Sequence, residues 1–80
     1  MGVNKPENAV LDLTGLKCPL PALYARRALE RGGPGAIITV VSDDPMAAVD
    51  LPHMCTTEGY VVVRSAREDG AVRMVLQRPA

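Results

Sequence analysis

The sequence predicts an α/β (α+β) fold, a two-layer sandwich in which two helices cover one face of a four-stranded mixed sheet. Four short segments of alternating or continuous apolar residues are typical of strands. Two segments of helix-forming residues separate the first three of them, and an Asp-Gly pair joins the last two as a hairpin. The expected order is therefore β-α-β-α-β-β, and right-handed crossovers place both helices on the same face of the sheet.

The first half of the chain supplies a strand, a turn and a helix. Residues 9–14 alternate at period two, as in a half-buried strand, and Gly15 ends the alternation. A Cys-Pro-Leu-Pro tetrapeptide follows at residues 18–21. Residues 22–31 are then strong helix formers, and the Gly-Gly-Pro-Gly segment at residues 32–35 ends that helix.

Three further strands are expected in the second half. Residues 36–41 form a continuous β-branched run, which suits a central strand buried by its neighbours. Residues 60–66 and 71–78 are the other two strands, joined by the Asp-Gly turn at residues 69–70.

A second helix is expected between these strands, from Met46 to about Glu58. Asp44 can cap it, with Pro45 at its first position, where a missing N–H costs nothing. Pro52 interrupts the helix, so we expect a kink or a restart capped by Asp50.

Composition limits the classes of function. The chain has 80 residues, so we expect one domain, residues 1–80, with its core at about 9–78. Nine basic and nine acidic residues give zero net charge, which argues against direct binding of nucleic acid. The first eight residues lack a secretory signal, and no segment approaches the roughly 20 apolar residues of a membrane span. We therefore expect a cytoplasmic protein with no membrane partner.

Cys18 carries the clearest chemical signal. It lies between a strand and a helix, where unpaired N–H groups and the helix dipole favour a thiolate. Pro19 and Pro21 have no N–H and hold the turn rigid. The donors expected to face the sulfur are those of Leu20, Ala22 and Leu23. We therefore expect a lowered pKa for Cys18, helped by Lys17. The alternative is a small buried hydrophobe.

Two segments stand out together. The first is Leu-Lys-Cys-Pro-Leu-Pro at residues 16–21, followed by a helix that holds Arg-Arg at residues 26–27. The second comprises Ser-Asp-Asp-Pro, Asp-Leu-Pro and Cys-Thr at residues 42–45, 50–52 and 55–56. In this spacing they resemble the TusA-like (SirA-like) family of sulfur carriers. The resemblance covers about residues 9–78.

The resemblance implies a sulfurtransferase that carries sulfur. Cys18 would accept sulfane sulfur as a persulfide by thiol exchange and hand it on. The donor would be a protein such as a cysteine desulfurase or a rhodanese, and the acceptor a protein of tRNA thiolation, sulfur oxidation or cofactor synthesis. No cofactor is expected beyond the covalent persulfide. A relay protein that docks several partners in turn should be a monomer.

The first helix is expected to present a docking surface beside Cys18. Its small face, assigned to the sheet, comprises Ala22, Ala25, Ala28 and Leu29. Its opposite, apolar and basic face comprises Leu20, Leu23, Tyr24, Arg27 and Arg31. The predicted motif and docking residues are thus Lys17, Pro19, Leu20, Pro21, Leu23, Tyr24, Arg26 and Arg27. The alternative is that Leu23 and Tyr24 pack into the edge of the core.

Five other residues are candidates for a chemical role. Cys55 is a candidate second thiol, although burial is the more ordinary role of a free cysteine, and its place late in the second helix argues against a disulfide with Cys18. His53 is the single histidine, and the cysteines lack metal-ligand spacing, so no metal site is expected. Capping would explain Asp44 and Asp50, whereas the role of Asp43 stays open.

Two other functions compete with the sulfur carrier. A thiol-redox protein would need a resolving cysteine, but Pro21 occupies the place where Cys-x-x-Cys would put it. A regulatory or nucleic-acid-interacting module with the same small fold is the second alternative. Two tyrosines and zero net charge offer such a module little stacking or electrostatic attraction.

Overall fold

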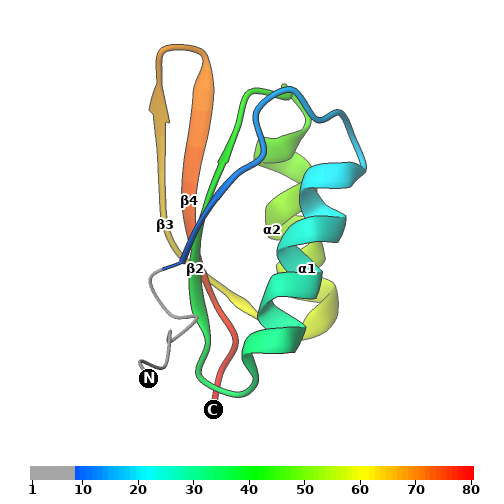
Figure 1. Ribbon diagram of the computed structural model, residues 1–80, viewed down its shortest axis with the longest axis vertical. Coiled ribbons are helices and arrows are strands. Elements are labelled where there is room, and N and C mark those ends of the chain that lie inside the picture. Colours follow the sequence, from blue (N-terminus) through cyan, green and yellow to red (C-terminus); the bar gives the residue numbers. More distant parts are fainter. Residues whose placement is uncertain (1–8) are drawn as a thin grey trace, which may run out of the picture.

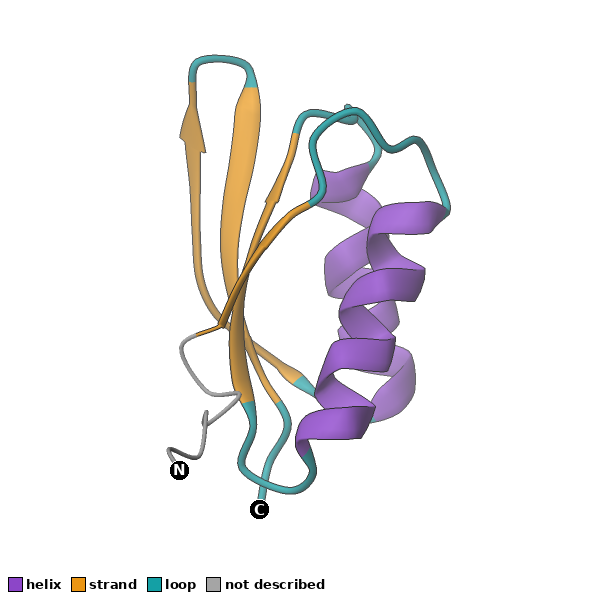
Figure 2. Cartoon of the chain, in the orientation of Figure 1, coloured by secondary structure: helices purple, strands orange, loops and turns teal. Residues whose placement is uncertain are grey.

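The computed structural model describes residues 9–80 and has the predicted order of elements. These are β1 (Ala9–Asp12), α1 (Leu20–Gly32), β2 (Ile37–Ser42), α2 (Ala47–Glu58), β3 (Val61–Glu68) and β4 (Ala71–Gln77). Both helices lie on one face of the sheet, so the two-layer α+β architecture is confirmed (Figures 1 and 2). The prediction that the chain begins without a secretory signal concerns residues 1–8, which lie outside the described residues.

The strands form one mixed sheet in the order β1-β2-β4-β3. β1 pairs parallel to β2, whereas β4 pairs antiparallel to both β2 and β3. The crossover through α2 places β3 one strand position away from β2. The β3–β4 hairpin then brings β4 into the position between β2 and β3. Because β1 and β2 are parallel, their carboxyl ends meet at one edge, and the loops that lead into α1 and α2 lie together there (Figure 1).

The core lies between the sheet and the helices. Ile38 and Val40 of β2 and Leu76 of β4 point into it and are at most 1% exposed. Leu29 of α1 and Leu51 of α2 meet them from the other layer and are fully buried. The face of α1 assigned to the sheet is therefore confirmed in its central residues.

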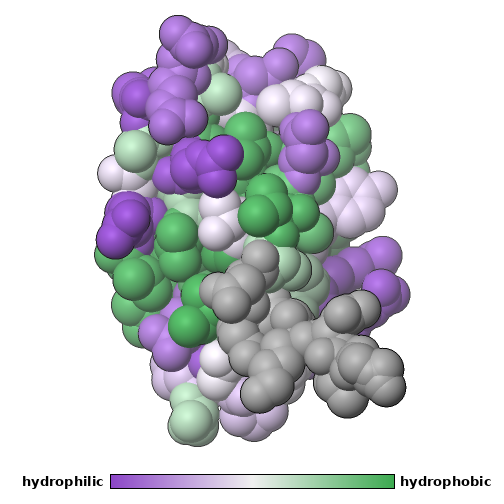
Figure 3. Space-filling model, turned by 60° about the vertical axis from the view of Figure 1, so that its left-hand side comes forward, coloured by the Kyte–Doolittle hydropathy of each residue, from purple (hydrophilic) through white to green (hydrophobic). Residues whose placement is uncertain are grey.

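The opposite face of the sheet is open. β2 is buried on alternate residues only, so the continuous apolar run at residues 36–41 belongs to a strand with one covered face and not to one buried on both. Val10 of β1 and Val61 and Val63 of β3 are exposed. Figure 3, turned toward this side of the molecule, shows hydrophobic residues grouped together with hydrophilic ones around them.

The β3–β4 hairpin follows the sequence signal. Asp69 and Gly70 both have positive φ, 49° and 79°, as a two-residue turn of type I′ requires. β3 extends two residues beyond its expected end at Ala66, because each residue from Arg64 to Glu68 has a partner on β4.

Candidate functional site around Cys18

Cys18 lies in an exposed turn at the carboxyl end of β1. Two residues later α1 begins at Leu20, with Pro19 as its N-cap residue and Pro21 buried beneath its first turn. The peptide bond between Cys18 and Pro19 is cis. The thiol is presented to solvent by a turn in which Pro19 and Pro21 follow it, and the alternative of a buried Cys18 is wrong.

The N–H groups expected to face the sulfur are mostly used elsewhere. The Leu20 N–H donates to the carbonyl oxygen of Lys17 at 2.8 Å, and the Leu23 N–H donates to that of Pro19 at 3.1 Å. Of the three expected donors, only Ala22 is left. The turn therefore bonds to itself and does not form a cradle for an anion.

Two aspartates of the β2–α2 loop hold the Cys18 loop from the other side. Oδ2 of Asp44 accepts the backbone N–H of Cys18 at 2.8 Å, and Oδ1 of Asp43 accepts that of Gly15 at 2.9 Å. Asp44 is only 7% exposed. It makes no side-chain cap on α2, whose N-cap residue is Met46, so the capping role expected of Asp44 is wrong. Its side chain instead contacts the Cys18 turn, and the open question about Asp43 has a structural answer.

The position of Asp43 and Asp44 in the sequence already indicates these contacts. An Asp-Asp pair directly after a strand lies at the edge where a parallel neighbour also ends. Polar side chains at that edge reach across to the adjacent loop, residues 13–19, which contains Gly15 and Cys18.

Asp50 belongs to the interior of α2 and not to a second cap. The helix runs without a restart through Pro52, its sixth residue, so the expected restart is wrong. A proline at this place removes only an early hydrogen bond of the helix. Asp50 lies in the first turn of α2, and its side chain acts on the Cys18 thiol from there.

The pKa of Cys18 is raised, which contradicts the lowered value expected from the helix N-terminus. The first cause is a hydrogen bond with the Asp50 side chain, which only the protonated sulfur can donate. Desolvation and the negative charges of Asp50 and Asp44 act in the same direction. The charge at a helix N-terminus is only partial, and two of the three N–H groups expected to face the sulfur donate to backbone carbonyls instead.

Cys55, unlike the exposed Cys18, is buried. It is 2% exposed and belongs to the core, and burial raises the pKa of its thiol. Both cysteines are free. The structure thus favours the interpretation of Cys55 as a core residue over that of a second reacting thiol.

Iodoacetamide should therefore distinguish the two thiols. Cys18 should be alkylated in the folded protein, whereas Cys55 should react at least about 100-fold more slowly, because it is accessible only when the chain opens. Peptide mass spectrometry of a time course would measure both rates. Equal rates under native conditions would contradict the buried position of Cys55.

The exposed face of α1 has the predicted composition. Leu20 and Tyr24 are 37% and 43% exposed and Arg27 is exposed, whereas Leu23 is half-buried. The alternative of Tyr24 packed into the core is therefore wrong. Arg26 is engaged within the chain, with ion-pair distances of 3.9 Å to Glu30 and 3.8 Å to Glu58 of α2.

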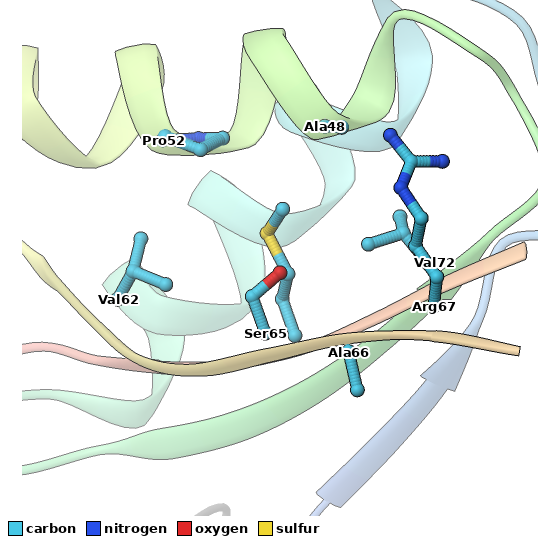
Figure 4. A pocket seen from close by; sticks show the side chains of 8 residues that line it. Ala48, Pro52, Val62, Ser65, Ala66, Arg67 and Val72 are labelled. Carbon is cyan, nitrogen blue, oxygen red and sulfur yellow. The ribbon is translucent and has the colours of Figure 1, made fainter.

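Two grooves border the helices. One, of about 360 Å³, lies between α1 and α2 beside the turn, and Pro19, Leu23, Arg26 and His53 are among its lining residues. The other, of about 400 Å³, lies between α2 and the β3–β4 hairpin. In Figure 4, Pro52 of α2 lies across this groove from Val62 and Ser65 of β3, and Arg67 stands at one end. Neither cysteine lines either groove.

Within residues 9–80, neither helix is long and apolar enough to span a membrane. The same residues contain no group of three or more His, Cys, Asp or Glu placed to hold a metal ion.

The chain was compared with families of known proteins. The family described as sulfurtransferase TusA matches this chain over residues 9–78. This chain belongs to the TusA family. The match includes the Cys18 turn, both aspartate-bearing segments and all the secondary-structure elements, so the resemblance drawn from the two sequence segments is confirmed.

Individual members of the TusA family are similar over most of their length. The sulfur carrier protein TusA of Pseudomonas paraeruginosa is 31% identical over 75 residues, which are 94% of this chain and 95% of that protein. A relative from Neisseria meningitidis, whose name as a sulfur carrier protein is provisional, is 40% identical over 67 residues, 84% and 90% of the two chains. The crystal structure of a SirA-like protein from Desulfitobacterium hafniense has the same fold, with a TM-score of 0.78 at 24% identity over 90% of this chain and 99% of that one.

Proposed function

We propose that this chain is a sulfurtransferase that accepts sulfane sulfur as a persulfide on Cys18 and relays it to an acceptor protein. The observation that carries the proposal is the exposed thiol of Cys18, held in a defined turn of a TusA family member. The other thiol, Cys55, lies in the core, where no partner can reach it. A reducing compartment such as the cytoplasm suits a free, exposed thiol.

The transfer is an exchange of sulfur between thiols. The Cys18 thiolate attacks the outer sulfur of the donor's persulfide, the new Cys18 S–S bond forms, and the donor's S–S bond breaks. The electron pair of that bond leaves with the donor cysteine, whose thiolate takes up a proton. Delivery repeats the exchange with an acceptor thiolate, and Cys18 is then the leaving group. No external oxidant or reductant is needed, because the sulfane sulfur keeps its oxidation state.

The partners belong to two classes. The donor is a protein that carries a persulfide, a cysteine desulfurase or a rhodanese. The acceptor is a protein of tRNA thiolation, sulfur oxidation or cofactor synthesis. The carrier acts as a monomer and needs no other cofactor. A thiol-redox role is disfavoured because the buried Cys55 offers Cys18 no resolving partner within the chain.

Loading by a desulfurase tests the proposal. The protein is incubated with a cysteine desulfurase and cysteine, and its intact mass is measured. We expect the addition of one sulfur atom and its removal by a reductant. If no persulfide donor of either class adds sulfur to the folded protein, the proposal is wrong.

The exposed face of α1 would dock these partners. Leu20, Tyr24 and Arg27 lie on it close to the Cys18 turn, and an exposed apolar surface with a basic margin is typical of an interface. The neighbouring Lys17, Pro19, Leu23 and Arg26 complete the docking surface. Pro21, which was also predicted there, is buried beneath the first turn of α1 and can only support that surface from below.

Reversal of one charge on this face should slow sulfur receipt. Arg27→Glu should reduce the rate of loading from a protein donor by roughly three- to tenfold at low ionic strength, because the variant repels the acidic surface that Arg27 attracts. Stopped-flow or quenched loading at several salt concentrations would measure this.

Arg64→Glu is the matched control for this experiment. It makes the same charge reversal at an exposed residue of β3, on the other layer of the molecule. Its loading rate should stay at that of the unaltered protein. If the two variants load at the same rate, the exposed face of α1 is not the docking surface.

A further inference from the structure

The Cys18 turn is held by a buried carboxylate that accepts the backbone N–H of the reacting residue. Oδ2 of Asp44 lies 2.8 Å from the backbone nitrogen of Cys18 itself, and Asp44 is more than nine-tenths buried. Asp50, in the first turn of α2, acts on the Cys18 thiol as a hydrogen-bond partner and as a negative charge. The exposed sulfur thus lies within the electrostatic influence of two carboxylates.

The charges around the thiol are predominantly negative. Within the two loops and the first turns of α1 and α2, the charged side chains are Lys17, Asp43, Asp44 and Asp50. Three carboxylates in this set stand against one ammonium group. His53 lines the groove beside the turn, together with Arg26 and Glu58, which form an ion pair. The first turn of α1 contributes no acidic residue. An incoming group with positive charge therefore finds a favourable potential beside Cys18, and an incoming anion finds a repulsive one.

We propose that Asp44 and Asp50 determine specificity in sulfur exchange at Cys18, favouring reaction partners that place positive charge beside their reacting sulfur and disfavouring anionic ones. As a statement about sulfur delivery, this rests on the proposed carrier function. Asp44 is in addition a positioning residue, because its carboxylate fixes the backbone nitrogen of Cys18. The partner class is thus a protein thiol or persulfide with a Lys or Arg next to it.

The physical effect has two parts. In the free protein the two carboxylates favour the protonated thiol over the thiolate, because they raise the pKa of Cys18. A cation that approaches with the partner's sulfur offsets their charge, the Cys18 proton leaves to solvent, and the thiolate forms where it is needed. Small anions, such as free anionic persulfides, gain no such help and are repelled. The carrier would then react preferentially with its protein partners.

Two small disulfides of opposite charge separate this effect from protein docking. Cystamine carries an ammonium group on each half, and dithiodiglycolate carries a carboxylate on each half. In each reaction the Cys18 thiolate attacks one sulfur, the reagent's S–S bond breaks, and the other half leaves as a thiolate that takes a proton from water. The measurement is the ratio of the two exchange rates in a Cys55→Ala background, at low ionic strength.

The ratio of cystamine to dithiodiglycolate rates should fall by roughly three- to tenfold in Asp50→Asn and in Asp44→Asn, since each variant removes one charge from the edge of the site. Comparing ratios between variants cancels the intrinsic difference between the reagents. The pH midpoint of alkylation by neutral iodoacetamide should also move to lower pH, because removal of a carboxylate lowers the pKa of Cys18. Added salt should reduce the difference in this rate ratio between the variants and the background protein.

Asp69→Asn is the matched control. It removes one negative charge from the turn between β3 and β4, the two strands farthest from β1 in the order of the sheet, and Asn tolerates the positive φ there. Its ratio and pH midpoint should equal those of the background protein. If Asp44→Asn loses its fold, as its urea midpoint would reveal, the more exposed Asp50→Asn carries the test.

Unchanged ratios in a folded Asp50→Asn protein, or an equal fall in Asp69→Asn, would overturn the proposal. These readings are independent of persulfide loading. A protein with a charge-dependent ratio that never accepts sulfur from a desulfurase refutes the carrier function. A protein that loads fully but shows no dependence on charge refutes the specificity role alone.

Discussion

Cys18→Ser should abolish both the loading of sulfur and its onward transfer. A serine hydroxyl at this place is neither a thiolate nor a soft nucleophile toward sulfane sulfur, so the variant cannot form the S–S bond on which the carrier depends. The fold should be unaffected, because the side chain of Cys18 is exposed and the turn is held through backbone groups. Intact-mass measurement after incubation with a desulfurase and cysteine would show no added sulfur.

Cys55→Ala is the control for that experiment. The residue lies in the core and contacts no solvent, so its removal should reduce stability and leave sulfur loading at Cys18 nearly complete. The opposite pattern, with Cys18→Ser loaded and Cys55→Ala not loaded, would move the carrier role to Cys55 and refute the site described here.

Leu51→Ala should cause the largest loss of stability among these variants. Leu51 is fully buried in α2 at the center of the helix–sheet interface. Truncation removes buried apolar surface and leaves a cavity, at a cost of about 2–5 kcal/mol in free energy of unfolding. A chain of this length has a stability of roughly 4–12 kcal/mol, so the change is a large part of the total. Urea denaturation should show a lower midpoint at an unchanged m-value.

Val49→Ala, two residues earlier on the same helix, is its control. Val49 is 58% exposed and has little packing to lose, so its urea midpoint should stay close to that of the unaltered protein. A loss at Val49 as large as at Leu51 would mean that the helix is packed by a different face.

Most of the fold could be predicted from local patterns. The alternation at residues 9–14 identified β1, and Leu13 is buried as its period requires. The Asp69-Gly70 pair placed the hairpin, because few residues other than Gly adopt its backbone angles. Proline was the weaker guide. At Pro52 it indicated a restart of α2, but a proline this early in a helix displaces little hydrogen bonding, and the helix continues.

The candidate site was predicted in part. Cys18 was found by its place between a strand and a helix, and the exposed face of α1 by the helical period. The missed residues are the aspartates, because Asp44 and Asp50 also match the local pattern of helix caps. Their actual contacts depend on which loops meet at the edge of the sheet, and a local pattern does not contain that information.

The sequence by itself determined the order of elements, the family and the identity of the reactive thiol, because these depend on neighbouring residues and on short motifs. Only the tertiary structure decided the state of that thiol. The largest cause of its raised pKa is the side chain of Asp50 in α2. Asp44, 26 residues from Cys18 along the chain, adds its negative charge from its place against the Cys18 backbone nitrogen. Electrostatic effects follow distance in space and not separation in sequence, so the pKa of Cys18 is raised where its position at a helix N-terminus alone predicted a lowered value.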